Sequence, residues 1–140
     1  MPPNPLHSYQ KIAAQTAPPG HLVQMLFDGA IRFLDRALAS FQHKDPLEFN
    51  QNINNNIIRA QDILRHLDAS LDLERGGELA ATLRRLYRYM FRRLHESNMR
   101  KSRDGIEETI ARLTVLRDAW SEMLRQQGHA PAPAKEPAIS

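Results

Sequence analysis

The 140-residue chain is long enough to bury one core, and its 41% hydrophobic and 25% charged residues are typical of a soluble globular domain. It contains no cysteine, which excludes a disulfide framework, a thiolate nucleophile and a cysteine-ligated zinc site. The net charge is a modest +3, no apolar run approaches the ~20 residues of a membrane span, and the start MPPNPLHSYQ lacks the pattern of a signal peptide, so we expect a cytosolic protein without membrane insertion.

The two ends of the chain differ in composition from its centre. Residues 1–20 contain five prolines and end in TAPPG, which predicts an extended N-terminal arm with at most one or two helical turns near Tyr9. Residues 128–140 have the proline and alanine content of a disordered tail. Residues 21–127 have helical periodicity and no strand pattern, so we expect one helical domain there.

Four stretches of this central region have apolar residues spaced three and four apart, which places them on one face of a helix. The connections HKDP at 43–46, ERGG at 74–77 and SRDG at 102–105 are short and contain helix breakers, and Asp45 followed by Pro46 is a good helix start. Short connections between four amphipathic helices predict an all-α, antiparallel up-down four-helix bundle. In chain order the stripes are Val23, Phe27, Ala30, Leu34, Ala37, Phe41; Ile53, Ile57, Ala60, Leu64, Leu67, Leu71; Leu79, Leu83, Leu86, Met90, Leu94; and Ile106, Ile110, Leu113, Leu116, Trp120, Leu124.

The first predicted helix is apolar over about 180° of its circumference, whereas a bundle helix needs little more than ~100°. Leu22, Leu26 and Phe33 form one flank beside the core stripe, with Met25 just beyond them. Gly29 lies next to this flank and indicates close approach of another backbone. Two interpretations fit this arc: the helix contacts two neighbours in the bundle, or the flank is an exposed groove for a further helix or peptide.

The groove interpretation gives a set of partner-binding candidates. Tyr9 and Ile12 are apolar anchors in the arm and would cap the groove in the free protein. A plain disordered arm is the other interpretation of that segment. With the flank of the first helix, and with residues of the second and third helices that would border it, the candidates are Tyr9, Ile12, Leu22, Met25, Leu26, Phe33, Ile58, Leu64, Tyr87 and Phe91.

No catalytic or cofactor site is predicted. The six histidines lack metal-ligand spacing and are interpreted as surface residues, and Gly76-Gly77 lacks the residues that complete a phosphate loop. Glu108 is within i, i+4 reach of Arg112, which indicates a solvated charged face. We therefore expect no enzyme activity, no cofactor, no metal and no small-molecule substrate.

Positive charge is concentrated in the third predicted helix. Residues 84–103 contain eight lysines and arginines and one acid, Glu96. Arginines interleaved with aromatic residues also occur in nucleic-acid-binding surfaces. Three interpretations stay open, namely a basic solvent face, a nucleic-acid-binding module and a surface for an acidic protein. Nucleic acid is the less favoured partner, because no DNA-reading motif surrounds the run.

Three stretches of the sequence resemble the FliS family of flagellin-specific export chaperones. They are YQKIAAQTAPPGHLVQMLFDGA at 9–30, IIRAQDILRHLDASLDLERGGELA at 57–80 and LYRYMFRRLHESNMRKS at 86–102, and LRDAWSEM in the last predicted helix also fits. Their order and spacing match the family over residues 9–123, which is nearly all of the predicted helical part. Arg88 departs from the resemblance, since the family often has an acid at this position.

The resemblance implies a helical bundle that binds the disordered C-terminal segment of flagellin and keeps the subunit monomeric in the bacterial cytosol. It also implies delivery of that client to the export gate of the flagellar type III apparatus. The client would fold on binding, as helices and an extended piece wrapped around the bundle. The alternatives are a basic module that binds nucleic acid or an acidic protein through residues 84–103, and a structural bundle that dimerises through its apolar flank.

Overall fold

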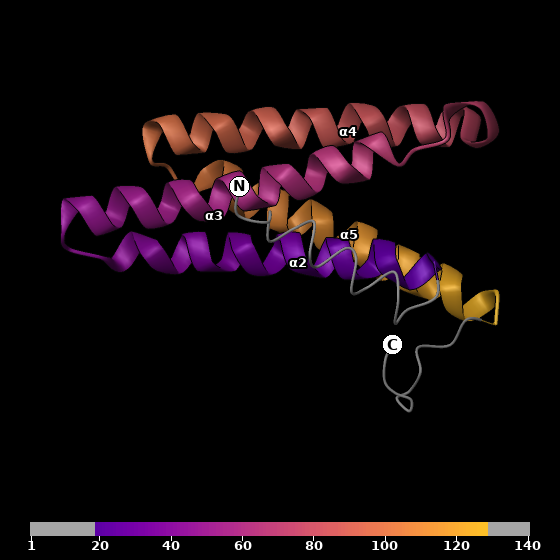
Figure 1. The fold of residues 1–140 in the computed structure, drawn as a ribbon, viewed down its shortest axis with the longest axis horizontal. Helices are drawn as coiled ribbons and strands as arrows, with labels where there is room; N and C mark the ends of the chain where they lie inside the picture. Colours follow the sequence, from indigo (N-terminus) through magenta and orange to yellow (C-terminus); the bar gives the residue numbers. More distant parts are fainter. Residues whose placement is uncertain (1–18, 129–140) are drawn as a thin grey trace, which may run out of the picture.

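The computed structural model describes residues 19–128, and this range contains four α-helices and one short 3₁₀ turn. The elements are α2 (Pro19–Ala39), η1 (Ser40–Gln42), α3 (Pro46–Ala69), α4 (Leu73–Arg100) and α5 (Asp104–Gln126). Consecutive helices run in opposite directions along a common long axis (Figure 1). The predicted antiparallel up-down four-helix bundle is therefore confirmed. The predictions for the N-terminal arm and the C-terminal tail lie almost entirely outside the described residues.

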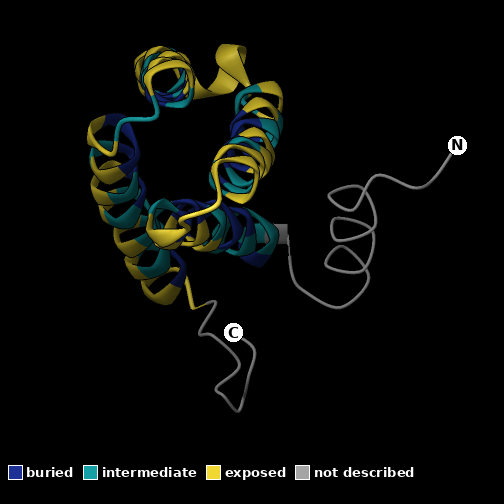
Figure 2. Cartoon of the chain, turned by 90° about the vertical axis from the view of Figure 1, so that its left-hand side faces the viewer, coloured by how far each residue is buried: buried dark blue, intermediate teal, exposed yellow. Residues whose placement is uncertain are grey.

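The four helices form a ring in which each packs against two neighbours. α2 contacts α3 and α5, α4 contacts the same two helices, and the diagonal pairs do not approach each other directly. In the view of Figure 2 the buried residues face a common centre, and exposed residues lie on the outside of the ring. None of the helices within residues 19–128 has the length and apolar character that crossing a bilayer requires.

The predicted apolar stripes supply most of the core. Leu79 is an exception, because it is 69% exposed while the neighbouring Ala80 is buried. The prediction extended the helical period back to Leu79, close to a kink at Gly77, where the backbone leaves the helical region. Core residues that come from the stripes include Phe27, Ala30, Leu34, Ile53, Ile57, Ala60, Leu64, Leu67, Met90, Leu94, Ile106 and Leu113.

The helix ends follow the predicted capping at one connection and differ at the two others. The Asp45 carboxylate accepts a hydrogen bond from the Leu47 N–H at 3.1 Å, and Pro46 is the first helical residue, as predicted. Asp72 caps α4 in the same way, so the ERGG stretch is not a link but an extra helical turn that ends at Gly77 (φ 52°). The last connection is shorter than predicted, since α5 already begins at Asp104.

Gly105 allows the ends of α4 and α5 to cross closely. Its N–H donates to the Ser97 hydroxyl at 2.8 Å, and a Cβ at this position would lie 2.5 Å from the Arg93 carbonyl oxygen. A side chain there would collide with backbone, which cannot move without displacing the helix. The glycine read from the sequence as a helix breaker is therefore a packing residue inside α5.

Candidate partner-binding surface

The wide apolar arc of α2 is shared between two neighbouring helices. On one side a Cβ at Gly29 would make ordinary contact with Ile63 of α3, at 3.4 Å. On the other side the Trp120 indole N–H donates to the Gly20 carbonyl at 2.7 Å, and Arg117 of α5 pairs with Asp28 at 3.3 Å. The contact with two neighbours, which was one of the two interpretations, therefore accounts for much of the arc. Gly29 marks the close approach of α3.

Not all of the predicted flank of α2 is enclosed. Leu26 is 4% exposed and belongs to the core, so it offers almost no surface to a partner. Leu22, Met25 and Phe33 are only half-buried. The Phe33 ring lies beneath two guanidinium groups, with Arg36 of α2 and Arg59 of α3 at 5.6 and 5.7 Å from the ring centroid. Long charged side chains thus cover an apolar ring at the seam between α2 and α3.

A second seam, between α3 and α4, contains a pocket of about 260 Å³. Cross-helix hydrogen bonds fix the antiparallel register of this seam: the Asn98 amide donates to Asn54 at 2.8 Å, and the Gln61 amide donates to the Phe91 carbonyl at 3.1 Å. The pocket brings predicted residue Leu64 of α3 next to Tyr87 and Phe91, which lie one turn apart on α4. Its lining is Leu64, Arg65, Asp68, Tyr87, Arg88 and Phe91.

The floor of this pocket is apolar, and its rim is charged. Leu64 and Tyr87 are buried, whereas Phe91 is half-buried and lies under Arg65, whose guanidinium carbon is 4.7 Å from the ring centroid. Burial raises the pKa of Tyr87 to about 12, and the negative charge of Asp68 adds to the rise. The Tyr87 hydroxyl, neutral at physiological pH even at the ordinary pKa of 10, stays neutral, and the floor carries no charge.

The remaining predicted residues lie between or outside these two seams. Ile58 is 44% exposed on α3. Its helix carries Arg59, which reaches the α2 seam, and Arg65, which reaches the α4 seam. The predicted residues of α2 and α4 thus border two seams, one on either side of α3. Tyr9 and Ile12 lie outside the described residues.

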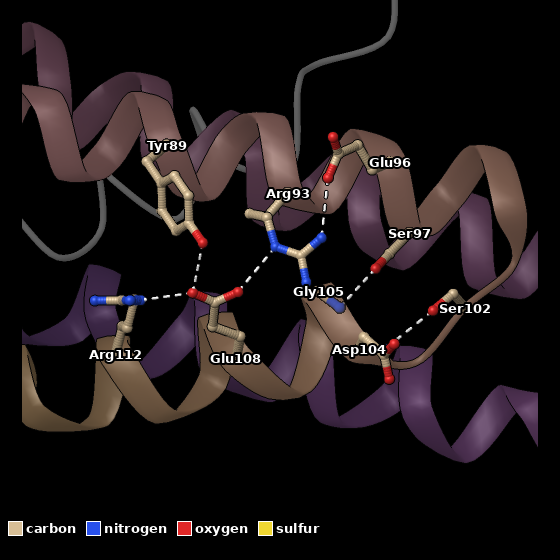
Figure 3. Close-up of polar contacts among 9 residues, drawn as sticks. All are labelled: Tyr89, Arg93, Glu96, Ser97, Ser102, Asp104, Gly105, Glu108 and Arg112. Atoms are coloured by element: carbon tan, nitrogen blue, oxygen red, sulfur yellow. Dashed lines mark hydrogen bonds and ion pairs between the residues drawn. The ribbon is translucent and has the colours of Figure 1, made fainter.

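Much of the positive charge predicted on the third helix is neutralised within the bundle. Glu108 of α5 receives hydrogen bonds from Arg93 at 2.8 Å, from the Tyr89 hydroxyl at 2.7 Å and from Arg112 at 3.0 Å (Figure 3). Arg93 also pairs with Glu96 at 2.9 Å. These hydrogen bonds, that of Arg93 foremost, lower the pKa of Glu108 to about 2. The cluster joins α4 to α5 and has a structural role.

Only part of the arginine run is available for a partner. Arg84 and Arg88 share Asp68 at 3.0 and 3.5 Å. Among residues 19–128, Arg85 and Arg92 form no ion pair, and both are exposed. The exposed face of α4 is therefore basic beside the pocket, but it is less basic than the sequence count suggests.

Sequence reasoning missed the Glu108 cluster and the burial of His21. The i, i+4 rule identified Arg112 as a neighbour of Glu108, but the contacts with Tyr89 and Arg93 depend on how α4 and α5 pair in space. His21 is 4% exposed, and neither ring nitrogen has a hydrogen-bond partner in the described part of the chain, so its interpretation as a surface residue is wrong. No group of three histidines and acidic residues in that part is placed to hold a metal ion.

Comparisons with known proteins agree with the resemblance seen in the sequence. The family model described as "Flagellar protein FliS" matches residues 2–127. The chain is 32% identical over 124 residues to the flagellar secretion chaperone FliS of Bacillus subtilis (strain 168), covering 89% of each protein. It is 37% identical over 112 residues to the flagellar secretion chaperone FliS of Salmonella typhimurium, covering 79% of this chain and 80% of that protein. A relative of the same name from Escherichia coli (strain K12) is 36% identical over 113 residues, 80% of either chain.

Proposed function

Since this chain belongs to the FliS family of flagellar proteins, we propose that it is a cytosolic export chaperone for flagellin. It binds the disordered C-terminal segment of flagellin, prevents premature polymerisation and aids delivery to the flagellar type III export apparatus. The relatives are named flagellar secretion chaperones, and these names support this proposal.

The observation that carries the proposal is the pair of half-buried aromatic rings on either side of α3. Phe33 borders the seam with α2 and Phe91 borders the seam with α4, and each ring is covered by an arginine of α3. Ile58 adds an exposed apolar side chain to α3. A segment that wraps across α3 would bury all three residues at once. Apolar side chains scattered singly over the surface could not be buried by one segment in this way.

The arginines that lie over the two rings, Arg59 and Arg65, keep this surface soluble and still let a client reach it. An exposed cation–π contact contributes only about 0.5–1 kcal/mol, so an incoming segment can displace it at small cost. Ordering a disordered client consumes about 2–5 kcal/mol of the contact energy, so the client must bury a large area. Two separate seams provide a larger wrapped area than a single pocket would.

The proposed binding residues are graded by their accessibility. Leu22, Met25 and Phe33 of α2, Ile58 of α3 and Phe91 of α4 would contact the client directly. Leu64 and Tyr87 would form the floor beneath a client side chain, and Leu26 would support the flank from the core. Tyr9 and Ile12 would cover the α2 flank in the free protein and be displaced by the client.

Calorimetric titration of the full chain with a flagellin C-terminal peptide tests the proposal. Phe33→Asp should weaken binding by at least about tenfold, because it places a charge where an apolar contact is needed. Val115→Asp on α5 is the matched control, since Val115 is exposed and belongs to neither seam. Leu26→Asp is unsuitable because Leu26 lies in the core. Circular dichroism confirms that each variant folds, and equal affinities for Phe33→Asp and Val115→Asp would contradict the assignment.

The alternative of a nucleic-acid-binding module has less support. Two of the eight basic residues in 84–103, Arg84 and Arg93, are held in partly buried ion pairs within the bundle. The affinity of a protein for nucleic acid depends on how many phosphates it neutralises. These ion pairs therefore reduce the positive charge that is left to bind phosphates. Heparin retention with a steep salt dependence would favour this alternative. Light scattering of the free chain would distinguish a monomeric chaperone or a monomeric nucleic-acid-binding module from a structural bundle that dimerises.

A further inference from the structure

The pocket between α3 and α4 combines an apolar floor with a basic rim, and this combination specifies the chemistry of an occupant. Leu64 and Tyr87 close the pocket from below, and Phe91 forms a wall. The volume of about 260 Å³ is below the ~300–1,000 Å³ of pockets that hold whole small molecules, so the pocket is suited to a single large side chain. The uncharged floor favours an apolar side chain.

Charge around the pocket is unbalanced. Asp68 already pairs with two arginines, and Asp62 pairs with Arg65 at 3.3 Å. Arg85 and Arg92 continue the basic surface along α4 and have no ion pair within residues 19–128. Two arginines of the lining, Arg65 and Arg88, are joined on α4 by Arg84, Arg85 and Arg92, and near them lie two aspartates, Asp62 and Asp68. The rim therefore attracts negative charge.

The two arginines that line the pocket are held only weakly in place. The side chain of Arg65 is 68% exposed and that of Arg88 is 61% exposed. Ion pairs with this exposure contribute about 0–1 kcal/mol, so either guanidinium can exchange its aspartate for a new carboxylate at little cost. Arg84 is more enclosed and closer to Asp68, and it keeps that aspartate neutralised.

We propose that this pocket receives one apolar side chain of an amphipathic client segment, and that carboxylates of the same segment pair with Arg65 on the α3 side and Arg88 on the α4 side. This inference rests on the proposed function, because it takes the client as the occupant. Arg92, one helical turn beyond Arg88 on α4, extends the contact to a second acidic residue of the segment. Acidic residues one turn from an apolar anchor are thus the signature of the segment that binds here.

The positions of the acidic residues favour a peptide over a nucleic acid. Asp68 lines the pocket and Asp62 pairs with Arg65 beside it, so two carboxylates lie within the basic surface. A phosphate backbone carries a charge at every nucleotide and would meet these carboxylates at close range. A peptide carries isolated carboxylates that can be placed next to the arginines only, and its apolar side chain uses the pocket.

Calorimetric titration of the full chain with the C-terminal segment of flagellin, at low and at high salt, tests the inference. Arg65→Gln and Arg88→Gln should each weaken binding about five- to tenfold at low salt, with a smaller difference at high salt. Arg125→Gln removes the same charge from an exposed position at the end of α5 and should change affinity less than about twofold. Phe91→Ala should weaken binding at both salt concentrations, because it removes a wall of the pocket and no charge.

The outcomes separate the inference from the function on which it rests. If the unchanged chain binds the segment and Arg65→Gln and Arg88→Gln bind it as tightly as Arg125→Gln does, the inference is wrong and the proposed function stands. If the unchanged chain does not bind the segment, both are wrong. A single-stranded 20-nucleotide DNA is the second probe. If the unchanged chain binds this DNA and Arg65→Gln and Arg88→Gln abolish the binding, the ligand of this surface is a nucleic acid and the inference is wrong.

Discussion

The guanidinium carbon of Arg65 lies 4.7 Å from the centroid of the Phe91 ring, so that a charged residue of α3 covers an aromatic residue of α4. Arg59 covers Phe33 of α2 at 5.7 Å on the other side of the same helix. Without these two arginines Phe91 would be open apolar surface, and Phe33 would be covered by Arg36 of α2 alone. A flexible charged side chain over each ring keeps the free chain soluble and still lets a partner reach the ring.

Removal of these covers should expose apolar surface and leave the fold intact. Arg59→Ala with Arg65→Ala should increase the fluorescence of a bound hydrophobic dye and lower the free energy of unfolding by less than about 1 kcal/mol, because exposed cation–π and ion-pair contacts are weak. Arg125→Ala is the control, because Arg125 pairs with Glu122 of its own helix and lies over neither Phe33 nor Phe91. A loss of several kcal/mol in the double variant would mean that the arginines hold the bundle together.

The Glu108 cluster should make stability depend on pH in the acid range. Its hydrogen bonds lower the pKa of Glu108 to about 2, so the stabilisation is complete above the ordinary carboxyl pKa of 4.5 and is lost as the pH falls from there towards 2. Glu108→Gln should therefore lower the free energy of unfolding by about 1 kcal/mol at pH 7 and by much less at pH 2. Urea unfolding at both pH values checks this, and an equal loss at both would exclude a role for the charge.

Two glycines should respond to substitution in opposite ways. Gly105→Ala should lower the free energy of unfolding by about 2 kcal/mol or more, since its Cβ would meet the Arg93 carbonyl at 2.5 Å. Gly29→Ala places its Cβ at an ordinary 3.4 Å from Ile63, and alanine favours the helix by about 1 kcal/mol, so the change should be neutral or stabilising. Thermal unfolding of both variants checks this prediction, and an equal loss of stability in the two would contradict it.

Two leucines of the same predicted stripe in α4 should respond differently to truncation. Leu94→Ala should lower the free energy of unfolding by about 2–5 kcal/mol, because Leu94 is fully buried. Leu79→Ala should change it by less than about 0.5 kcal/mol, because Leu79 is largely exposed. A large loss for Leu79→Ala in urea unfolding would indicate that the stripe continues through the start of α4.

Sequence periodicity predicted the bundle well where a helix is regular. The α3 stripe from Ile53 to Leu67 is buried, because period alone decides which face of an unbroken helix points inward. It failed at Leu79, two residues after the break in the helix at Gly77, because a period gives the face of a residue and not how deeply each position on that face is buried. It also left the arc of α2 with two interpretations, since a period cannot tell how many neighbours a helix has.

The sequence predicts which residues of the candidate site share a face of one helix, but not which helices pair to bring these faces together. Leu64, Tyr87 and Phe91 were named together, and the antiparallel register of α3 and α4 does bring them to one pocket. That Phe33 and Phe91 border different seams follows from the ring order of the helices, which no local pattern encodes. The use of Arg93 by Glu108 likewise depends on the pairing of α4 with α5.

Light scattering of the chain mixed with flagellin is the measurement that tests the proposed function most directly. We expect a soluble 1:1 complex with full-length flagellin and no complex with flagellin that lacks its C-terminal segment. Equal binding of the truncated flagellin, or flagellin that polymerises unhindered in the presence of the chain, would contradict it.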